Sequence, residues 1–262
     1  MRLKITHRTS YAYAAPIERG VELVRLFPSA HAGLSVLRWF VTAKGARVGQ
    51  SFLDGVANRS ALVDLNPGVE SFEILVEGEV ETRDSKGLVE GAAEPLPPGY
   101  FLRETRLTTP NAAIAALTPK GADQGARAIA LMHAVRERID FQVGVTDVHV
   151  DAAAALERGG GVCQDHAHVF LAAARAAGIP ARYVSGYLYT GEKNEPASHA
   201  WCEAYVETGW LGLDAANRAI VNDGYVRLAV GLDYREAAPI AGVRVGGGTE
   251  TLAVEVGVRA EQ

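Results

Sequence analysis

The stretch Gly159–Leu171, GGGVCQDHAHVFL, decides how the rest of the sequence is interpreted. It holds Cys163, one of only two cysteines among 262 residues, where three glycines give way to a helical pattern. Apolar residues follow at positions 167, 170, 171 and 174, which is helical spacing. Gly178 and Pro180 are typical signals just past the end of a helix. The pattern predicts a helix over residues 163–177 with a thiol in its first turn.

A thiol at a helix start is a candidate nucleophile. The unpaired N–H groups of the first turn and the helix dipole favour a negatively charged thiolate. The preceding glycines allow a sharp turn and leave room for a substrate carbonyl beside the Cys163 N–H, which would donate to an oxyanion. A lone cysteine is as readily a small buried hydrophobic residue, so the choice depends on its partners.

The partners stand in the stretch Ser198–Asn217, SHAWCEAYVETGWLGLDAAN. Two strands joined by the two-residue loop Glu207-Thr208 place His199 and Asp214 on one face of a sheet, and an odd loop without a bulge would separate them. Cys202 then belongs to the opposite, buried face. His199 is the expected base and Asp214 the group that fixes its tautomer.

A zinc site is the main alternative for the same residues, because Cys163-x-x-His166 and His199-x-x-Cys202 form a possible four-ligand set. Positions 199 and 202 of a strand point to opposite faces, which argues against it. We expect no metal, and we expect His166 and His168 to be structural. The remaining histidines receive no role: His7, His31, His133 and His149.

Composition excludes several other classes of protein. With 48% apolar and 22% charged residues the chain is globular, and its net charge of −5 without a basic run argues against nucleic acid as a partner. No stretch approaches the apolar length of a membrane span, and the N-terminal residues lack the apolar core of a signal peptide. We therefore expect neither nucleic acid nor membrane as partner, and a cytoplasmic location.

The pattern along the chain predicts two parts. Short alternating runs between residues 3 and 80 indicate a β-rich domain, and a proline-rich segment at 94–99 ends them. Helical patterns follow at 111–118, 122–139 and 152–157, and strands return from residue 182 onward. We expect a β-rich N-terminal domain over 1–100 and an α+β catalytic core over 101–262, with helices packed on an antiparallel sheet.

Around Cys163, His199 and Asp214 the sequence resembles the bacterial transglutaminase-like proteins, a papain-like superfamily of cysteine enzymes. The resemblance implies a papain-like transglutaminase core, a β-rich N-terminal region, and Cys163, His199 and Asp214 as nucleophile, base and orienter. The matching blocks are residues 161–168, 177–187, 198–201 and 210–214 in the core, 5–13 and 26–28 near the N-terminus, and 231–234.

The sequence departs from the papain pattern at the second oxyanion donor. The glutamine that papain-type enzymes carry shortly before the nucleophile is absent, and Gln142 is the candidate in its place. Tyr187, Trp201 and Trp210 are the expected lining of a substrate cleft. Three glutamates are candidates to attract a cationic acceptor, Glu192, Glu195 and Glu203, although the first two stand in an expected exposed turn.

The expected chemistry is acyl transfer from a peptide or side-chain amide through a thioester, without a cofactor. Hydrolysis is the expected outcome, with a peptide or protein as substrate. Two alternatives stay open at this point: a transglutaminase that transfers the acyl group to an amine, and a non-catalytic peptide-binding module with the same fold.

Overall fold

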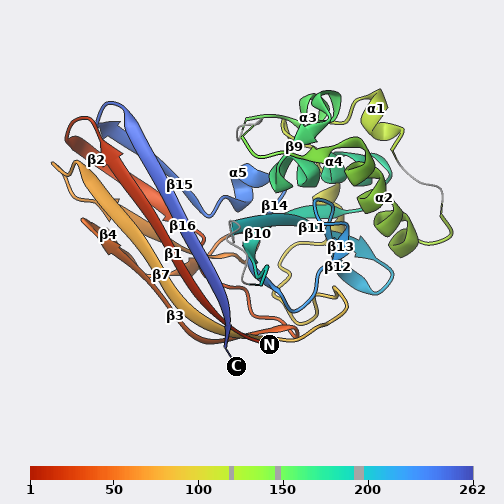
Figure 1. The fold of residues 1–262 in the computed structure, drawn as a ribbon, viewed down its shortest axis with the longest axis horizontal. Coiled ribbons are helices and arrows are strands. Elements are labelled where there is room, and N and C mark those ends of the chain that lie inside the picture. Colours follow the sequence, from red (N-terminus) through yellow and green to blue (C-terminus); the bar gives the residue numbers. More distant parts are fainter. Residues whose placement is uncertain (118–120, 145–148, 192–197, 262) are drawn as a thin grey trace.

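The computed structural model describes residues 1–117, 121–144, 149–191 and 198–261. Figure 1 shows two units side by side, a β sandwich and a unit in which helices cover a sheet. The expected fold class, an α+β core with a β-rich N-terminal region, is confirmed. No helix in the described ranges is long and apolar enough to cross a membrane.

The β sandwich consists of two antiparallel sheets. One has the order β16 (Glu250–Glu261), β1 (Arg2–Tyr13), β7 (Ser71–Thr82) and β3 (Leu34–Lys44). The other has the order β15 (Ile240–Gly246), β2 (Ile17–Val24), β6 (Arg59–Leu65) and β4 (Ala46–Val48), with β5 (Phe52–Leu53) beside β6. In β1 the odd-numbered side chains from Leu3 to Tyr13 are buried and nearly all the even-numbered ones are exposed, as expected for a strand with one face on a core.

Strands β15 and β16 lie in the sandwich, although the sequence places residues 240–261 in the catalytic part. Strand β16 pairs with β1 along its whole length, from Arg2 opposite Glu261 to Tyr13 opposite Glu250, and β15 pairs with β2. The expected boundary near residue 100 therefore needs a correction at the other end of the chain. Alternating apolar residues predict the strand at 251–258 but contain no information about its distant partner.

The second unit is built on one antiparallel sheet. Its order is β13 (Ala219–Ile220), β12 (Gly209–Asp214), β11 (Ser198–Val206), β10 (Ala181–Leu188) and β14 (Tyr225–Gly231). The helices and a small parallel pair complete it: η1 (Pro98–Leu102), α1 (Ala112–Ala115), α2 (Gln124–Arg138), β8 (Asp140–Phe141), α3 (Ala152–Arg158), β9 (Gly160–Gly161), α4 (Cys163–Ala176) and α5 (Tyr234–Ala237). The expected helices are present, with ends that differ by a few residues; Thr118, the expected end of the first, lies outside the described residues.

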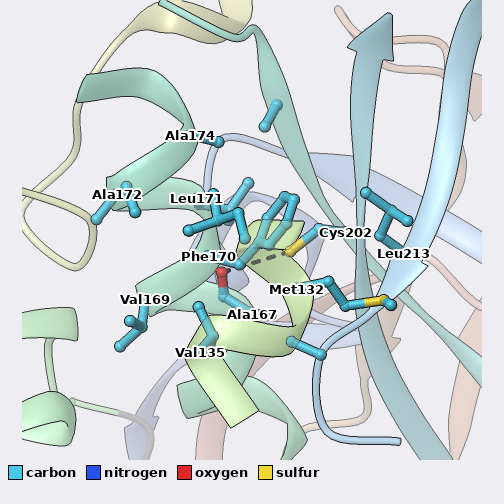
Figure 2. Packing of buried hydrophobic residues seen from close by; sticks show 14 of the residues in the cluster. Met132, Val135, Ala167, Val169, Phe170, Leu171, Ala172, Ala174, Cys202 and Leu213 are labelled. Atoms are coloured by element: carbon cyan, nitrogen blue, oxygen red, sulfur yellow. Dashed lines mark hydrogen bonds between the residues drawn. The ribbon is translucent and has the colours of Figure 1, made fainter. Parts of the chain in front are cut away.

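Helix α4 lies at the centre of this unit, against α2, α3 and β11. Alanines at 167, 172, 173 and 174 are fully or almost fully buried and allow neighbouring elements to approach closely. Figure 2 shows Cys202 of β11 among these side chains, where its Sγ donates a hydrogen bond to the Ala167 carbonyl at 3.4 Å. Cys202 is therefore a packing residue on the buried face, as the strand alternation predicts.

The sandwich and the second unit share apolar contacts. The hydrophobic cluster of the sandwich includes Tyr187 of β10 together with Val226 and Leu228 of β14. Strand β10 of the second unit thus contacts helix α4 and, together with β14, packs against the sandwich.

Candidate active site

Cys163 is the first residue of α4, and the local sequence holds it there. The Asp165 carboxylate accepts a hydrogen bond from the Val162 N–H at 2.8 Å, which fixes the turn before the helix. A Cβ on Gly161 would lie 2.5 Å from the Asp165 Oδ2, so only glycine fits beside this carboxylate. Gly159 ends α3 in the left-handed conformation with φ 69°. The glycines thus separate two helices and leave room for the carboxylate that caps the start of α4.

His199 and Asp214 meet across neighbouring strands. Strands β11 and β12 are joined by Glu207-Thr208, and their register pairs Cys202 with Leu213. This parity puts His199 and Asp214 on one face, and the His199 Nε2 lies 2.7 Å from the Asp214 Oδ2. Since Nε2 faces the carboxylate, Nδ1 is the ring nitrogen that remains for the thiol.

Asp214 is fully buried and is held by more groups than the sequence indicates. Its Oδ2 accepts hydrogen bonds from the Tyr225 hydroxyl at 2.8 Å and the Asn217 Nδ2 at 2.7 Å, and its Oδ1 accepts from the Asn217 N–H at 3.1 Å. Burial opposes the charged form, but the hydrogen bond and charge of His199, with the bonds from Asn217 and Tyr225, lower the pKa of Asp214. The carboxylate is therefore ionised beside the imidazole.

The imidazole of His199 is poised to carry a proton. Burial lowers its pKa, yet hydrogen bonds with Asp214 and with Cys163, and the negative charge of both, outweigh burial and raise the pKa to about 10. The protonated imidazole is thus a cation between the Asp214 carboxylate and the Cys163 side chain. This arrangement gives a nucleophile and a proton donor in the same site.

Trp201 supports His199 and does not line a cleft, contrary to the expectation from the sequence. It is buried with Val184, Tyr225 and Val230, and its ring centroid lies 6.4 Å from that of His199. Gly186 stands opposite His199 on β10, and a Cβ there would lie 2.6 Å from the indole of Trp201. The tryptophan fits under the histidine because residue 186 has no side chain.

Trp210 also lies away from the proposed cleft. It is buried against Phe101, and the guanidinium of Arg182 stacks on its ring at 3.9 Å. Arg182 and Arg227 enclose Glu203 with Nε–Oε distances of 2.7 and 2.8 Å. Burial opposes ionisation of Glu203, but both arginines lower its pKa to about 2. Glu203 is therefore committed to a buried ion cluster, which corrects its suggested role in attracting an amine.

A cavity of about 300 Å³ holds Cys163 and His199, and both units form its wall. Tyr187 lines it as expected, while the sandwich contributes β1 and β16, which the sequence did not connect to the site. A larger hollow of about 610 Å³ lies between residues near Phe27 and Arg227 and contains no triad member. We assign the candidate site to the smaller cavity because Cys163 and His199, which interact with each other, both line it.

His7 is the residue of this wall that the sequence left without a role. Its Nδ1 lies 2.8 Å from the Tyr187 hydroxyl and its Nε2 lies 2.8 Å from the Thr9 Oγ1. Burial lowers its pKa to about 4, so the ring is neutral near pH 7. A polar side chain at an inward position of the alternating strand Leu3–Tyr13 is the signal that marks it.

Gln142 follows β8 and packs beside the glycine turn. Its N–H donates to the Gly161 carbonyl at 2.9 Å, and its side-chain amide lies against Gly160, where a Cβ would be 2.8 Å from the Gln142 Oε1. The amide is thus close in the fold to the segment that leads into Cys163, and its role as oxyanion donor stays a prediction.

The residues of the considered zinc set are engaged elsewhere. The ring nitrogens of His166 face backbone carbonyl oxygens, Nδ1 that of Val162 at 2.8 Å and Nε2 that of Ile139 at 3.0 Å, and Cys202 lies in the core. Among the described residues no three histidine, cysteine or acidic side chains gather as a metal site. His168 is buried, and its Nε2 accepts from the Tyr234 N–H at 3.2 Å.

Comparisons with known proteins identify similar families and relatives. Residues 112–215 match the model of the transglutaminase-like superfamily, a range that contains Cys163, His199 and Asp214, and residues 3–81 match the bacterial transglutaminase-like N-terminal region. An uncharacterised protein of Mycobacterium leprae is 29% identical over an alignment of 275 positions, gaps included, that covers 97% of this chain and 97% of that one. An uncharacterised protein of Mycobacterium tuberculosis is 34% identical over 115 residues, covering 39% of this chain and 37% of that one.

A solved structure extends the likeness to the whole fold. The structure of a "putative cysteine protease" from Cytophaga hutchinsonii superposes with a TM-score of 0.78, covering 100% of this chain and 92% of that one, at 20% identity. At this identity the match shows that the fold is shared over the whole chain.

Proposed function

We propose that the protein hydrolyses amides through a cysteine thioester. The premise is that a bacterial transglutaminase-like N-terminal region is followed in this chain by a core of the transglutaminase-like superfamily. The supporting observation is the contact of His199 with Asp214 at 2.7 Å, together with the interaction of the same imidazole with Cys163. The substrates we propose are peptides or proteins.

The proposed reaction has two stages. The Cys163 thiolate attacks the amide carbonyl carbon, and the Cys163 N–H donates to the oxyanion that forms. The imidazolium of His199 then gives its proton to the departing nitrogen, the C–N bond breaks and a thioester remains. In the second stage His199 removes a proton from water, whose oxygen attacks the thioester, and the thiolate leaves as the acid forms. Asp214 holds the imidazole throughout.

We favour water over an amine as the acceptor because the cavity offers nothing for an ammonium group. None of its described lining residues is Asp, Glu, Lys or Arg, and Glu203 is bound by two arginines. Glu192 and Glu195 lie outside the described residues. An amine competes with water only when it is bound and oriented, which raises its effective concentration to values on the order of 10⁵ M or more.

The test offers the enzyme a glutamine-containing or simple peptide amide as donor, with a primary amine at millimolar concentration. We expect free acid as the main product by mass spectrometry, and no turnover in Cys163→Ala or His199→Ala. Predominant incorporation of the amine shows a transglutaminase. Turnover that persists in Cys163→Ala contradicts the thioester itself.

We also propose a cytoplasmic location, which is compatible with the unpaired state of Cys163 and Cys202. Fractionation of cells that make the protein tests it directly, and recovery outside the cytoplasm contradicts the proposal.

A further inference from the structure

Strand β16 presents a row of apolar side chains on the inner face of the sandwich, and half of that row is uncovered. Val256 and Val258 pack against the hydrophobic cluster. Leu252 and Val254 continue the same row but are 52% and 51% exposed. Because side chains alternate along a strand, these four residues share one face. Packing within the sandwich accounts for the apolar character of Val256 and Val258 but not for that of Leu252 and Val254.

The uncovered pair faces the catalytic cavity. Leu252 stands opposite Tyr11 and Val254 opposite Thr9 in the register of β16 with β1, and all four residues line the cavity that holds Cys163 and His199. Ile240 and Leu228 extend this surface from β15 and β14. We call Leu228, Ile240, Leu252 and Val254 the apolar wall. Leu228 is buried, so Leu252 and Val254 are the exposed part of this wall. Exposed apolar residues beside reactive groups are typical of a binding site.

The rest of the described lining offers no carboxylate, ammonium or guanidinium group to a charged ligand. The polar atoms of His7, Thr9 and Tyr187 bond one another at 2.8 Å, so their hydrogen-bonding capacity is largely used. The described lining contains no acidic or basic residue other than histidine; Glu22 and Glu250 act on the Tyr11 hydroxyl but are not part of the wall. A lysine-like side chain would lose water there without gaining a carboxylate partner, and the positive charge of His199 is already paired with Asp214.

We propose that the apolar wall is the subsite for the side chain on the acyl part of the substrate, and that it selects an uncharged, leucine-like or phenylalanine-like residue. This inference rests on the proposed function, because it assigns a specificity to the acyl group that Cys163 receives. The sandwich and its last strand therefore choose the substrate, while the second unit supplies the reaction. Burial of one leucine-sized side chain predicts a preference of about tenfold to a hundredfold.

The probes are N-acetyl aminoacyl chloromethyl ketones that differ only in the side chain: leucine, phenylalanine, aspartate and lysine. The thiolate displaces chloride, a C–S bond forms, and the adduct on Cys163 is quantified by mass spectrometry. We expect the leucine and phenylalanine reagents to react about tenfold or more faster than the charged ones. Equal rates across the series overturn the apolar subsite, as does a preference for aspartate or lysine.

Substitution assigns the preference to the wall. Each rate is divided by the iodoacetamide rate of the same variant, because iodoacetamide has no side chain and reports the reactivity of the thiol alone. On this scale the leucine reagent should slow by about tenfold or more in Leu252→Asp, and the lysine reagent should accelerate. Val243→Asp is the matched control. Val243 is an exposed residue of β15, the strand before β16 in the chain, and it lies outside the cavity. Selectivity that survives Leu252→Asp and Val254→Asp overturns the assignment.

Failure of the proposed function has a different signature. If iodoacetamide labels Cys163 at the same rate in wild type and in His199→Ala, the imidazole does not activate the thiol and the function is wrong. If that rate depends on His199 while the reagent series shows no preference, the function stands and the subsite is wrong.

Discussion

The surroundings of the two sulfur atoms differ completely. Burial raises the pKa of the Cys202 thiol well above its usual value, and its Sγ is bonded to a carbonyl in the core. Cys163 opens onto the cavity and interacts with the His199 cation. We expect iodoacetamide near neutral pH to label Cys163 at least about tenfold faster than Cys202 in the folded protein. Equal rates, measured by mass spectrometry of the two peptides, contradict the assignment of the nucleophile.

Asp214 acts on the reaction through His199. Asp214→Ala would leave the buried hydroxyl of Tyr225 without an acceptor and cost about 1–3 kcal/mol, so Asp214→Asn is the sharper change. The asparagine keeps the volume but removes the charge that stabilises the imidazolium. We expect kcat to fall by a factor on the order of 10²–10⁴. The melting temperature should change by only a few degrees.

A Tyr225→Phe variant is the control for Asp214→Asn, because it removes a bond to the carboxylate and leaves its charge. We expect a smaller loss of kcat than in Asp214→Asn. An Asp214→Asn enzyme that unfolds, yet retains wild-type activity per folded molecule, would make Asp214 a structural residue only.

Residue patterns predict the helix start at Cys163 and the contact between His199 and Asp214 because both depend on local geometry. A helix start fixes the position of Cys163, and a two-residue hairpin loop fixes the parity that unites His199 with Asp214. Asn217 and Tyr225, which hold the carboxylate, were missed, since only a turn and a further strand bring them to it. Trp201 and Trp210 were misplaced because aromatic residues near a site pack under it as readily as they line it.

Strand β10 holds the space in which Trp201 packs beside His199, because Gly186 of β10 stands opposite the histidine. Its pairing with β14 shifts at Ser185 and Gly186, and a Cβ on Gly186 would lie 2.2 Å from the Val226 carbonyl oxygen. We expect Gly186→Ala to lower the free energy of unfolding by about 1–3 kcal/mol through overpacking. It should also reduce turnover, because Trp201 must move away from His199.

The matched control is Gly99→Ala in η1, where nothing lies within 4 Å of the added Cβ. Thermal denaturation and hydrolysis rates of both variants check the prediction. Equal stability of the two variants would mean that β10 relaxes around residue 186 without moving the tryptophan.

Most elements follow from the sequence, and the exceptions have a physical reason. Regular spacing predicts α4 and the strands of the second unit. Strand β2 mixes buried, half-buried and exposed positions without clean alternation, and β15 leaves most of its side chains exposed, so neither shows the pattern of a half-buried strand. Such strands form because neighbouring strands offer hydrogen bonds, and that information lies elsewhere in the chain.

Association of the two units should depend on pH through His7. Its pKa is lowered to about 4 by burial, below the usual 6.5, so its neutral form stabilises the fold above pH 6.5 and that contribution is lost as the pH falls toward 4. We expect the melting temperature of His7→Gln to fall less than that of wild type over this interval.

His31 and His168 have pKa values lowered to about 4 in the same way, so part of the acid sensitivity should persist in His7→Gln. His133→Gln, at an exposed position of α2, is the control and should match wild type. Calorimetry at several pH values makes the comparison. Identical acid sensitivity in His7→Gln and wild type would show that the bond to Tyr187 does not couple the units.

The arrangement of the whole molecule is the part that sequence patterns could not predict. The division near residue 100 follows from a change in composition, but the cavity depends on the meeting of β1, β10 and β16. Pairing between strands so distant in the chain leaves no mark on either segment beyond its own alternation. The substrate wall and the role of His7 were therefore beyond prediction.

The pairing of β16 with β1 also sets a time at which the protein can begin to act. Ribosomes make the nucleophile, the histidine and the aspartate before they make residues 250–261, yet the wall of the cavity needs Leu252 and Val254. Contacts between such distant segments form late and slowly. A nascent chain that holds Cys163, His199 and Asp214 but not yet residues 250–261 thus lacks the apolar wall, and its thiol gains the proposed substrate preference only when β16 pairs with β1.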